Sequence, residues 1–285
     1  MTIVKTHVAV YYSPKNARSE LVGRALAQGL AKLAIPHKLL SSTGYPGKPE
    51  ADIAIFYGLS DGLKRIFDDY RIHRRALFVD LGYWHRRKKT RWDGYHKVCI
   101  DDRHPTAYFQ RVPRDDQRVR AMELPDPAPW RASGTHILVA GMSGKAAAAE
   151  GLAAEQWERE TIATLRRITS RPIIYRPKPN WNMARPILGA TLDATTPLEI
   201  ALRDCHVAVS HHSNVMIDAL MAGVPIICEG GAASVLNGGT LADVENPAMP
   251  DGREQFMRDL SYTQWKMEEM ASGMFWRFMR REGIV

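Results

Sequence analysis

One stretch of the sequence, residues 207–227, decides the fold and reads VAVSHHSNVMIDALMAGVPII. An apolar run at 207–209 leads into the polar turn 210–214, after which apolar residues recur at helical spacing. Gly223 is typical of a residue that ends a helix, and Pro225 introduces a second apolar run. The pattern predicts a strand, a short helix and a second strand of a parallel sheet. The polar turn would then lie at the carboxyl edge of that sheet, where ligands bind in such folds.

The same alternation of strand and helix extends over the rest of the chain. The patterns predict strands at 7–12, 38–40, 52–57, 76–81, 136–140, 172–175 and 224–228, and helices at 17–33, 61–73, 146–168, 197–203 and 261–281. We therefore expect an α/β protein of two Rossmann-like domains that face each other across a cleft. The N-terminal domain would span 1–124 and the second domain 136–260, joined by a proline-rich linker at 125–135. Residues 261–285 would contain a final helix.

The composition is that of an ordinary globular protein of 285 residues, with 45% hydrophobic and 25% charged residues. No apolar run approaches the 18 or more residues of a membrane span, and the first residues lack the pattern of a signal peptide. The three cysteines, Cys99, Cys205 and Cys228, form neither a disulfide framework nor a zinc motif. These features predict a soluble protein of the cytoplasm.

Positive charge is concentrated between residues 64 and 97, where eleven Lys or Arg residues accompany four Asp residues. The net charge of the whole chain is +8, so this segment holds most of it and favours an anionic partner. Aromatic side chains alternate with cations here, as in a clamp that holds phosphates and stacks on bases. The residues of this predicted acceptor or nucleic-acid surface are Tyr83, Trp84, Arg86, Arg87, Lys88, Lys89, Arg91, Trp92, Tyr95 and His96. A solvated loop with half-buried aromatic residues is the alternative interpretation.

Polar segments follow four predicted strands of the second half. Glycines can bring backbone N–H groups close to a phosphate, cations can neutralise it, and the start of a helix attracts anions. The residues predicted to bind phosphate are Gly141, Ser143, Gly144, Lys145, Arg176, Lys178, His211, His212, Ser213 and Asn214. Glu229, just after the strand at 224–228, would accept hydrogen bonds from sugar hydroxyls. The glycine segment is not a Walker A loop, because Ala146 stands where that motif has Ser or Thr. Each segment taken alone also suits a solvated turn.

In their order along the chain, these segments resemble the donor domain of GT-B glycosyltransferases. The resemblance covers about residues 136–230 and is to the branch of polysialyltransferases, capsule glycosyltransferases and teichoic-acid glycerophosphotransferases. That branch has a His-Pro motif after one strand and a Ser motif at the start of a later helix. Here Lys178 replaces the histidine of the first motif, within Arg-Pro-Lys-Pro, while Ser213 and Asn214 align with the Ser motif. The whole chain also resembles small proteins of tailed bacteriophages.

The resemblance implies that the second domain binds a nucleotide sugar by its diphosphate, with a UDP-sugar as the expected donor and no permanently bound cofactor. In this fold a positive cradle takes the place of a metal ion, so no metal site is expected. The resemblance also implies that the helix at 261–281 packs back onto the first domain, which would hold the acceptor. A hydroxylated base of phage DNA in the host cytoplasm fits the basic segment, as does another polyanion such as a glycan.

Several side chains of the first half are candidates for the base that deprotonates an acceptor hydroxyl. Asp80 ends the strand at 76–81, and His85 and Asp93 lie on the basic segment that follows. His96 and His104 are further candidates for this role. Two other functions fit the same sequence. A nucleotide-sugar epimerase shares the two-domain architecture, and a non-catalytic DNA-binding protein on a transferase-like fold would bind DNA without nucleotides.

Overall fold

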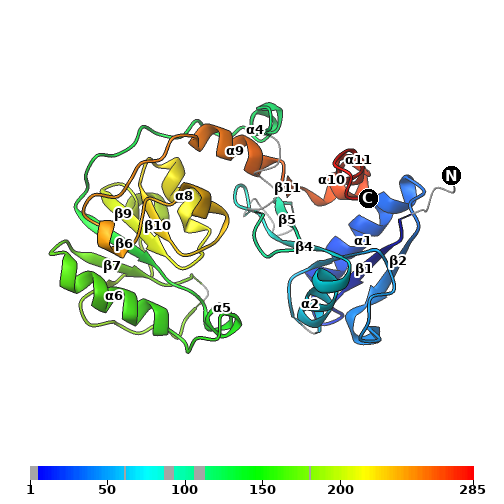
Figure 1. The fold of residues 1–285 in the computed structure, drawn as a ribbon, viewed down its shortest axis with the longest axis horizontal. Helices are drawn as coiled ribbons and strands as arrows, with labels where there is room; N and C mark the ends of the chain where they lie inside the picture. Colours follow the sequence, from blue (N-terminus) through cyan, green and yellow to red (C-terminus); the bar gives the residue numbers. More distant parts are fainter. Residues whose placement is uncertain (1–5, 61, 87–92, 106–112, 180) are drawn as a thin grey trace. The chain divides into compact units, whose positions relative to one another are not determined.

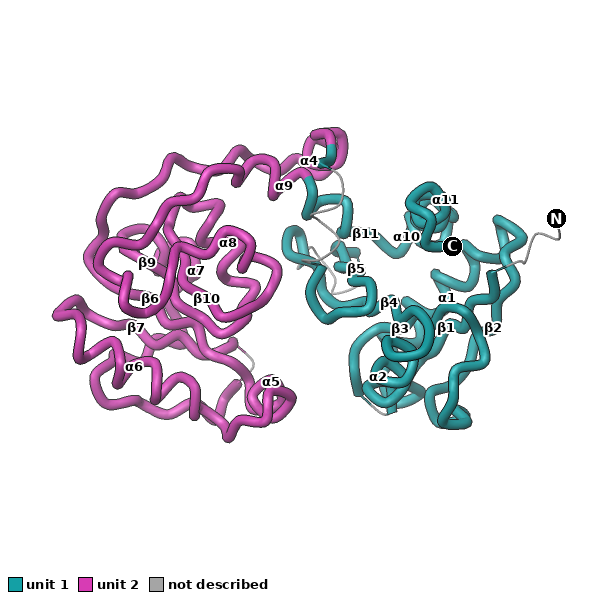
Figure 2. The backbone as a smooth tube through the Cα atoms, in the orientation of Figure 1, with its two compact units in different colours: residues 1–114, 259–285 teal, residues 115–258 magenta. Residues whose placement is uncertain are grey.

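The computed structural model describes residues 6–60, 62–86, 93–105, 113–179 and 181–285 (Figure 1). The chain forms two compact units. Unit 1 contains residues 1–114 and 259–285, and unit 2 contains residues 115–258 (Figure 2). In the described part of the chain, no helix has the length and apolar character needed to span a membrane.

The proline-rich segment expected to be a linker is part of unit 2. The backbone N–H of Ala128 donates to the Met221 carbonyl oxygen at 2.9 Å, and that of Arg131 donates to the Gly223 carbonyl oxygen at 2.8 Å. Prolines have no N–H group, but other residues of the segment supply these hydrogen bonds and hold it along unit 2. The boundary therefore falls after residue 114, earlier than the predicted linker.

Unit 1 is built on a six-stranded sheet in the order β11-β5-β4-β3-β1-β2. Strands β1 to β4 are parallel to one another. At one edge, β5 pairs antiparallel with β4, and β11 pairs antiparallel with β5. The elements in chain order are β1 (Val8–Tyr12), α1 (Ala17–Lys32), β2 (His37–Ser41), η1 (Ser42–Gly44), β3 (Ile53–Tyr57), α2 (Leu63–His73), β4 (Arg75–Leu81) and β5 (His96–Ile100). The strands and helices predicted before residue 82 are confirmed to within two residues, because apolar runs and helical spacing coincide with burial there.

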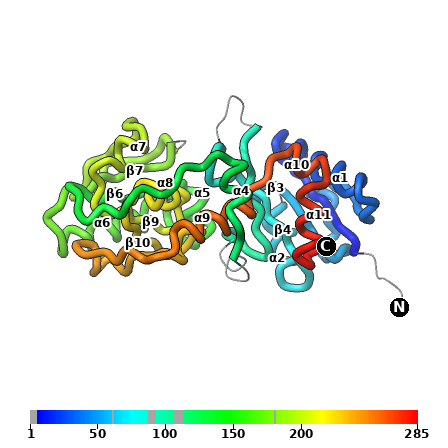
Figure 3. Tube along the Cα trace, turned by 90° about the horizontal axis from the view of Figure 1, so that it is seen from above, coloured from blue at the N-terminus to red at the C-terminus, as the bar shows by residue number. Residues whose placement is uncertain are grey.

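The last part of the chain completes unit 1. Residues predicted as one helix at 261–281 instead form the end of α9 (Arg253–Ser261), β11 (Gln264–Trp265), α10 (Met267–Ala271) and α11 (Met274–Arg281). β11 pairs with β5, and Trp276 Nε1 donates to the Leu26 carbonyl oxygen of α1 at 2.9 Å. Figure 3 shows α10 and α11, in red, beside α1, in blue. The prediction of a single helix was wrong, because the apolar residues of this segment belong to a strand and two short helices. These elements pack on β5 and α1, which are distant in the sequence.

Gly29 lies where α1 and α10 approach most closely, and its replacement gives a test of this packing. A Cβ on Gly29 would lie 2.0 Å from the Met270 carbonyl oxygen. Glycine-to-alanine changes inside helices usually stabilise by about 0.5–1 kcal/mol. Gly29→Ala is instead expected to lower the free energy of unfolding of unit 1 by about 1–3 kcal/mol, because the two helices must separate. Denaturant unfolding measures this difference.

Gly23→Ala on the same helix is the matched control. A Cβ on Gly23 would make an ordinary contact, 3.5 Å from Leu39 Cδ1. This variant should therefore be as stable as the parent protein or more stable. Equal stability of the two alanine variants would contradict the packing of α10 on α1.

Unit 2 is built on a five-stranded parallel sheet in the order β10-β9-β6-β7-β8. Its elements in chain order are α4 (Gln117–Ala121), β6 (His136–Ala140), α5 (Gly144–Ala149), α6 (Gln156–Ile168), β7 (Ile173–Arg176), β8 (Thr191–Leu192), α7 (Leu198–Ala201), β9 (Cys205–Ser210), α8 (Val215–Met221), β10 (Ile226–Cys228), η2 (Ala232–Leu236) and η3 (Leu241–Asp243), before α9. This is the strand order of a nucleotide-binding Rossmann domain, in which the order reverses between two central strands, here β6 and β9. Crossover helices α6 and α8 cover opposite faces of the sheet (Figure 1).

The helix predicted at 146–168 is interrupted. α5 ends at Ala149, and α6 begins only after Glu155, whose backbone is left-handed with φ +60°. The buried Glu155 carboxylate accepts hydrogen bonds from the Tyr175 hydroxyl at 3.2 Å and the Arg185 N–H at 2.8 Å. Gly151, with φ +75°, ends α5, which is a local signal, whereas the long-range contacts of Glu155 set the start of α6.

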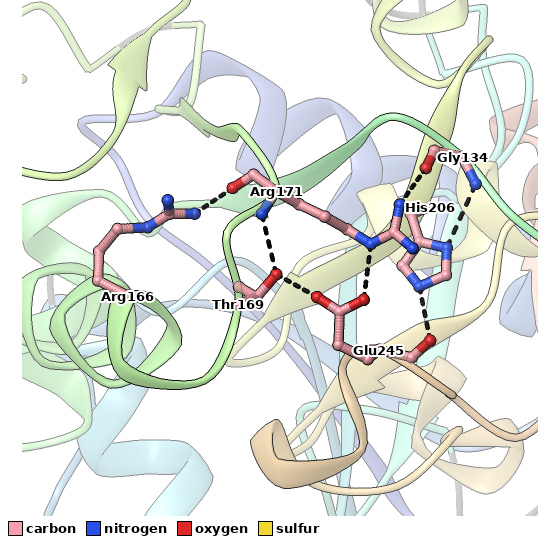
Figure 4. A network of polar contacts seen from close by, with 6 residues as sticks. All are labelled: Gly134, Arg166, Thr169, Arg171, His206 and Glu245. Atoms are coloured by element: carbon pink, nitrogen blue, oxygen red, sulfur yellow. Dashed lines mark hydrogen bonds and ion pairs between the residues drawn. The ribbon is translucent and has the colours of Figure 1, made fainter.

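A polar network closes the amino edge of the unit 2 sheet (Figure 4). Arg171 Nε lies 2.9 Å from Glu245 Oε2, and the same guanidinium donates to the Gly134 carbonyl oxygen. The His206 ring accepts from the Gly134 N–H at 3.3 Å and donates through Nε2 to the Glu245 carbonyl oxygen at 3.1 Å. Thr169 also donates to the Glu245 carboxylate. The polar groups of this network thus form hydrogen bonds with one another, and we assign the amino edge a structural role.

Candidate functional site

The polar segments predicted in the second half meet at the carboxyl edge of the unit 2 sheet. Ala140, the last residue of β6, pairs with Arg176 of β7 on one side and Ser210 of β9 on the other. Cys228 at the end of β10 pairs with Ser210 as well. The turn 210–214 therefore lies between the ends of β6 and β10, beside the reversal of strand order.

A cluster of four side chains lies at this turn. His211 Nδ1 and His212 Nδ1 are 2.7 Å apart, and His211 Nε2 is 3.6 Å from Glu229 Oε2. Trp157 of α6 donates from Nε1 to the other Glu229 oxygen, and its ring packs edge-to-face on His211. Glu229 is exposed and the histidines are half-buried, so the cluster is fixed by its own contacts yet reaches the surface.

A pocket of about 480 Å³ opens beside this cluster. Trp157, Ser210 and Glu229 contribute to its walls, together with Asn237 and residues 239–241. The Asn237 side chain holds that loop in place, because it accepts from the Cys228 N–H at 3.0 Å and donates to the Gly239 carbonyl oxygen at 2.8 Å. The volume is in the range of small-molecule sites, and the Glu229 carboxylate can accept hydrogen bonds from hydroxyl groups.

Sequence reasoning misses Trp157 and the loop 237–241. Trp157 lies 72 residues before its partner Glu229, and a tryptophan at helical spacing is typical of a core position. The Gly238-Gly239 pair, soon after the end of β10, is the kind of signal that indicates a backbone close to a ligand.

The glycine segment after β6 is shaped by packing. A Cβ on Gly141 would lie 2.8 Å from Tyr175 Cε2, and one on Gly144 would lie 2.6 Å from the Trp181 ring. Ser143 Oγ caps α5 by accepting from the Ala146 N–H at 3.3 Å, and Lys145 is exposed on the first turn. The missing side chains of Gly141 and Gly144 thus let aromatic rings pack closely against the backbone. This packing explains the two glycines without a bound phosphate.

Glu158 is a buried carboxyl group near the same segment. It is 1% exposed, and its Oε1 accepts from the Met142 N–H at 2.6 Å. Burial is the main cause that raises its pKa, and the His211 ring acts in the opposite direction. Its Oε2 has no hydrogen-bond partner in the part of the chain that the structure describes.

The two predicted phosphate cations after β7 have different surroundings. Arg176 Nη1 donates to the Thr196 carbonyl oxygen at 2.6 Å and lies 3.8 Å from Asp193 Oδ2. The Arg176 guanidinium is therefore paired with acceptor groups of unit 2 itself. Lys178 follows two residues later at the carboxyl edge and is half-buried. Both residues lie at the edge where the phosphates are predicted to bind.

Serine side chains hold the turn that leads into α8. Ser213 N–H donates to Ser210 Oγ at 3.1 Å, and Ser213 Oγ accepts from the Val215 N–H at 3.3 Å. Asn214 is the residue before the helix, and its side chain makes no capping hydrogen bond. Ser213 thus shapes the turn that leads into α8.

The aromatic residues predicted to stack on bases are buried in unit 1. Tyr83, Trp84, Tyr95 and His96 are 1–8% exposed, because β4 and β5 form an antiparallel pair that returns the segment to the sheet. Buried rings cannot stack on a base, so these four residues do not form the predicted surface. Arg86 donates to the Tyr83 carbonyl oxygen. Arg87, Lys88, Lys89, Arg91 and Trp92 lie outside the described residues.

The candidate catalytic bases lie around the loop between β4 and β5. Asp80 pairs in register with Lys97, and its Oδ1 accepts from the Leu81 N–H at 2.8 Å. His85 is half-buried and has a left-handed backbone with φ +48°. Asp93 is exposed near the other end of the loop. All three therefore belong to the carboxyl end of β4 and the loop that follows it.

The three cysteines are buried free thiols. Among the described residues, no three His, Cys, Asp or Glu side chains are grouped so that they could hold a metal ion. At the carboxyl edge of unit 2, His211 and Glu229 contact each other and Trp157 instead.

Burial of His96 makes unit 1 sensitive to acid. Burial, followed by the nearby Arg18, lowers the pKa of His96 from 6.5 to about 4. Below its ordinary pKa, the unfolded chain binds a proton that the folded unit does not, so stability is lost as the pH falls from about 6.5 to about 4. At about 1.4 kcal/mol for each pH unit, the expected loss is about 3 kcal/mol. Denaturant unfolding of His96→Gln should show a weaker pH dependence in this window, and an unchanged profile would contradict the assignment.

No protein-family model matches the chain, and no curated protein matches it. Among solved structures, the β-Kdo 2,4 transferase of KpsC from Thermosulfurimonas dismutans is 13% identical with a TM-score of 0.53, over 90% of each chain. The β-Kdo 2,7 transferase of the same protein is 14% identical with a TM-score of 0.49, over 95% of this chain and 99% of that one. The first similarity shows that the chain has the fold of GT-B glycosyltransferases, with two Rossmann-like domains.

Proposed function

We propose that the protein is a glycosyltransferase that takes its sugar from a nucleotide sugar bound at the carboxyl edge of the unit 2 sheet. One observation carries the proposal. On a fold shared with a Kdo transferase, the reversal of strand order coincides with a histidine pair, Glu229 and a pocket of about 480 Å³. Rossmann domains bind ligands at this edge, and the pocket suits the ribose or sugar of such a donor.

Within the site, we assign the donor's phosphates to Lys178, His212, Ser213 and Asn214, with the segment 141–145 beside them. The hydroxyl groups of the donor are assigned to the pocket at Glu229, whose carboxylate is an acceptor only. Positive charge from Lys178 and an imidazole would stabilise the departing nucleotide, the role that a metal ion has in other transferases. A UDP-sugar is the first donor to test.

We propose that the acceptor is a polyanion that binds unit 1. The support is the positive charge of residues 64–97, part of which lies on exposed positions of α2 such as Arg65 and Arg71. Asp80, His85 and Asp93 remain the proposed bases, since the carboxyl end of a parallel strand is where such groups act. DNA with a hydroxylated base is one such acceptor, and an anionic glycan is another. Binding that weakens steeply with salt is expected for either.

A thermal-shift screen tests the donor site. The purified protein is heated with UDP, GDP, CDP, CMP and ADP, and with UDP-glucose, GDP-mannose and CMP-sialate. A nucleotide at about 100 times its Kd should add about 2.7 kcal/mol of stability, which raises the Tm by about 5–10 °C. Nucleosides without phosphate are the control and should give smaller shifts. A flat screen, repeated with duplex DNA present, would favour a non-catalytic DNA-binding protein.

An activity assay separates transfer from epimerisation. The nucleotide sugar that binds is incubated with the protein alone, and then with duplex DNA or an anionic glycan. A transferase should release nucleotide faster when an acceptor is present. Conversion of the donor without any acceptor would instead identify an epimerase.

A further inference from the structure

The contact between His211 and His212 restricts how many protons the two rings can hold. Their Nδ1 atoms are 2.7 Å apart and the ring planes are nearly perpendicular, at 88°. A hydrogen bond at this distance needs one nitrogen with a hydrogen and one without. Two N–H groups cannot face each other there. The pair can therefore take up one proton beyond its neutral state, and the two rings titrate as a unit.

Glu229 decides which ring receives that proton. Its Oε2 lies 3.6 Å from His211 Nε2, and its other oxygen is held by Trp157 Nε1. The His211 backbone is fixed as well, because its carbonyl oxygen accepts from the Gly230 N–H at 2.8 Å. A carboxylate at this position favours hydrogen on His211 Nε2, which leaves His211 Nδ1 as the acceptor. His212 then donates through Nδ1, and an added proton resides on His212 Nε2.

Other acidic groups belong to the elements around the pair. Glu158 of α6 interacts with His211, and burial raises the pKa of this carboxyl group. Asp218 lies in the first turn of α8. Glu229 Oε2 lies 3.6 Å from His211 Nε2, and a carboxylate at this distance favours a protonated ring.

We propose that His212 is a proton-dependent phosphate ligand, and that Glu229, acting through His211, is the positioning residue that fixes its charged form. The inference rests on the donor site proposed above. The ligand class is the phosphate group of a nucleotide sugar. When the phosphate binds, one proton from solvent is taken up at His212 Nε2 and no covalent bond changes. At pH values low enough for His212 to carry this proton before the phosphate arrives, binding requires no further proton.

Calorimetric titration in buffers of different ionisation heat measures the proton uptake. The probes are UDP-glucose, GDP-mannose and CMP-sialate, because none has a phosphate proton to lose between about pH 6 and pH 8, where imidazoles titrate. Uptake should approach one proton at the upper end of this range. Affinity should therefore fall as the pH rises through this range, by up to about tenfold for each pH unit when one proton is taken up.

Three variants distinguish the roles of the side chains. His212→Gln should abolish the proton uptake and the pH dependence. Glu229→Gln should shift the pH dependence to lower pH, because the pair loses its carboxylate, and a merely structural role would not produce that shift. His136→Gln is the matched control. This histidine lies at the amino end of β6, with Nε2 2.9 Å from the Ala201 carbonyl oxygen, and its replacement should leave the uptake unchanged.

The outcomes separate this inference from the donor site itself. Binding of a probe without proton uptake, or uptake that persists in His212→Gln, would overturn the inference and leave the donor site standing. Failure of every probe to bind the parent protein would overturn both. If His212→Gln does not fold, NMR titration of the histidine rings in the parent protein decides the matter. One shared protonation step supports the pair, and two independent steps overturn it.

Discussion

A chain that ends at residue 258 is expected to lose the folded structure of residues 1–114 and to keep that of unit 2. The removed segment supplies eight buried apolar side chains of the unit 1 core, namely Tyr262, Trp265, Met270, Phe275, Trp276, Phe278, Met279 and Ile284. At about 1.5–3 kcal/mol for each buried side chain, their loss matches or exceeds the stability of a typical domain, about 5–15 kcal/mol. β5 also loses its antiparallel partner β11. Unit 1 therefore has no means of remaining folded.

Hydrogen exchange followed by mass spectrometry measures this result peptide by peptide. Peptides of β1, β3 and α1 should exchange rapidly in the truncated chain, and peptides of β6, β9 and α6 should remain protected. Trp276→Phe is the control, since it keeps most of the buried surface and loses one hydrogen bond, at a cost of about 1 kcal/mol. Protected β1 and β3 peptides in the truncated chain would show that the C-terminal segment is dispensable for unit 1.

Replacement of Lys178 by methionine should weaken binding of the donor by about 10- to 100-fold. Methionine keeps the length and the apolar stem of the side chain and removes its charge. A hydrogen bond to a charged group contributes about 1.5–3 kcal/mol, and about 1.4 kcal/mol corresponds to tenfold in Kd. The rate of transfer should fall further, by about 10²- to 10³-fold, because the charge on the phosphate grows as the nucleotide departs. Calorimetric titration gives the Kd, and nucleotide release gives the rate.

Two variants serve as controls for Lys178. Lys178→Arg retains the charge and should remain within about tenfold of the parent protein. Arg167→Met removes one positive charge from an exposed position of α6 and should leave the Kd unchanged. A Kd in Lys178→Met equal to that of the parent protein would exclude Lys178 as a phosphate ligand.

Local patterns predicted most of the strands, although not β5, β8 or β11, and the edge of the sheet where the candidate site lies. An apolar run followed by a polar turn, as at Ser210, indicates a buried strand that ends at the surface. Both features can be recognised within a few residues of sequence. The parallel arrangement then brings the ends of β6, β7 and β9 to the same edge without further information. The turn with His211 and His212 could therefore be assigned to the carboxyl edge from the sequence alone.

Features that depend on distant partners could not be predicted in this way. The aromatic and basic residues at 83–86 and 93–96 fit a solvated segment as well as a buried one, and only the pairing of Leu81 with His96 decides between the two. Trp265 also pairs with His96, from 169 positions further along the chain. Glu155 interrupts the predicted helix through its bond to Tyr175. In each case, the contact that decides the structure joins two segments that are separated along the sequence.

The division of unit 1 into two stretches of sequence has a consequence for its synthesis. A ribosome completes unit 2 while unit 1 still lacks β11, α10 and α11, and domains fold as they emerge. Unit 2 can thus reach its native state on the nascent chain, whereas residues 1–114 must wait with the β5 edge and much of their apolar core uncovered. An open strand edge of this kind invites pairing with other chains. During translation, residues 1–114 are therefore made before unit 2 but remain exposed to aggregation after unit 2 has folded.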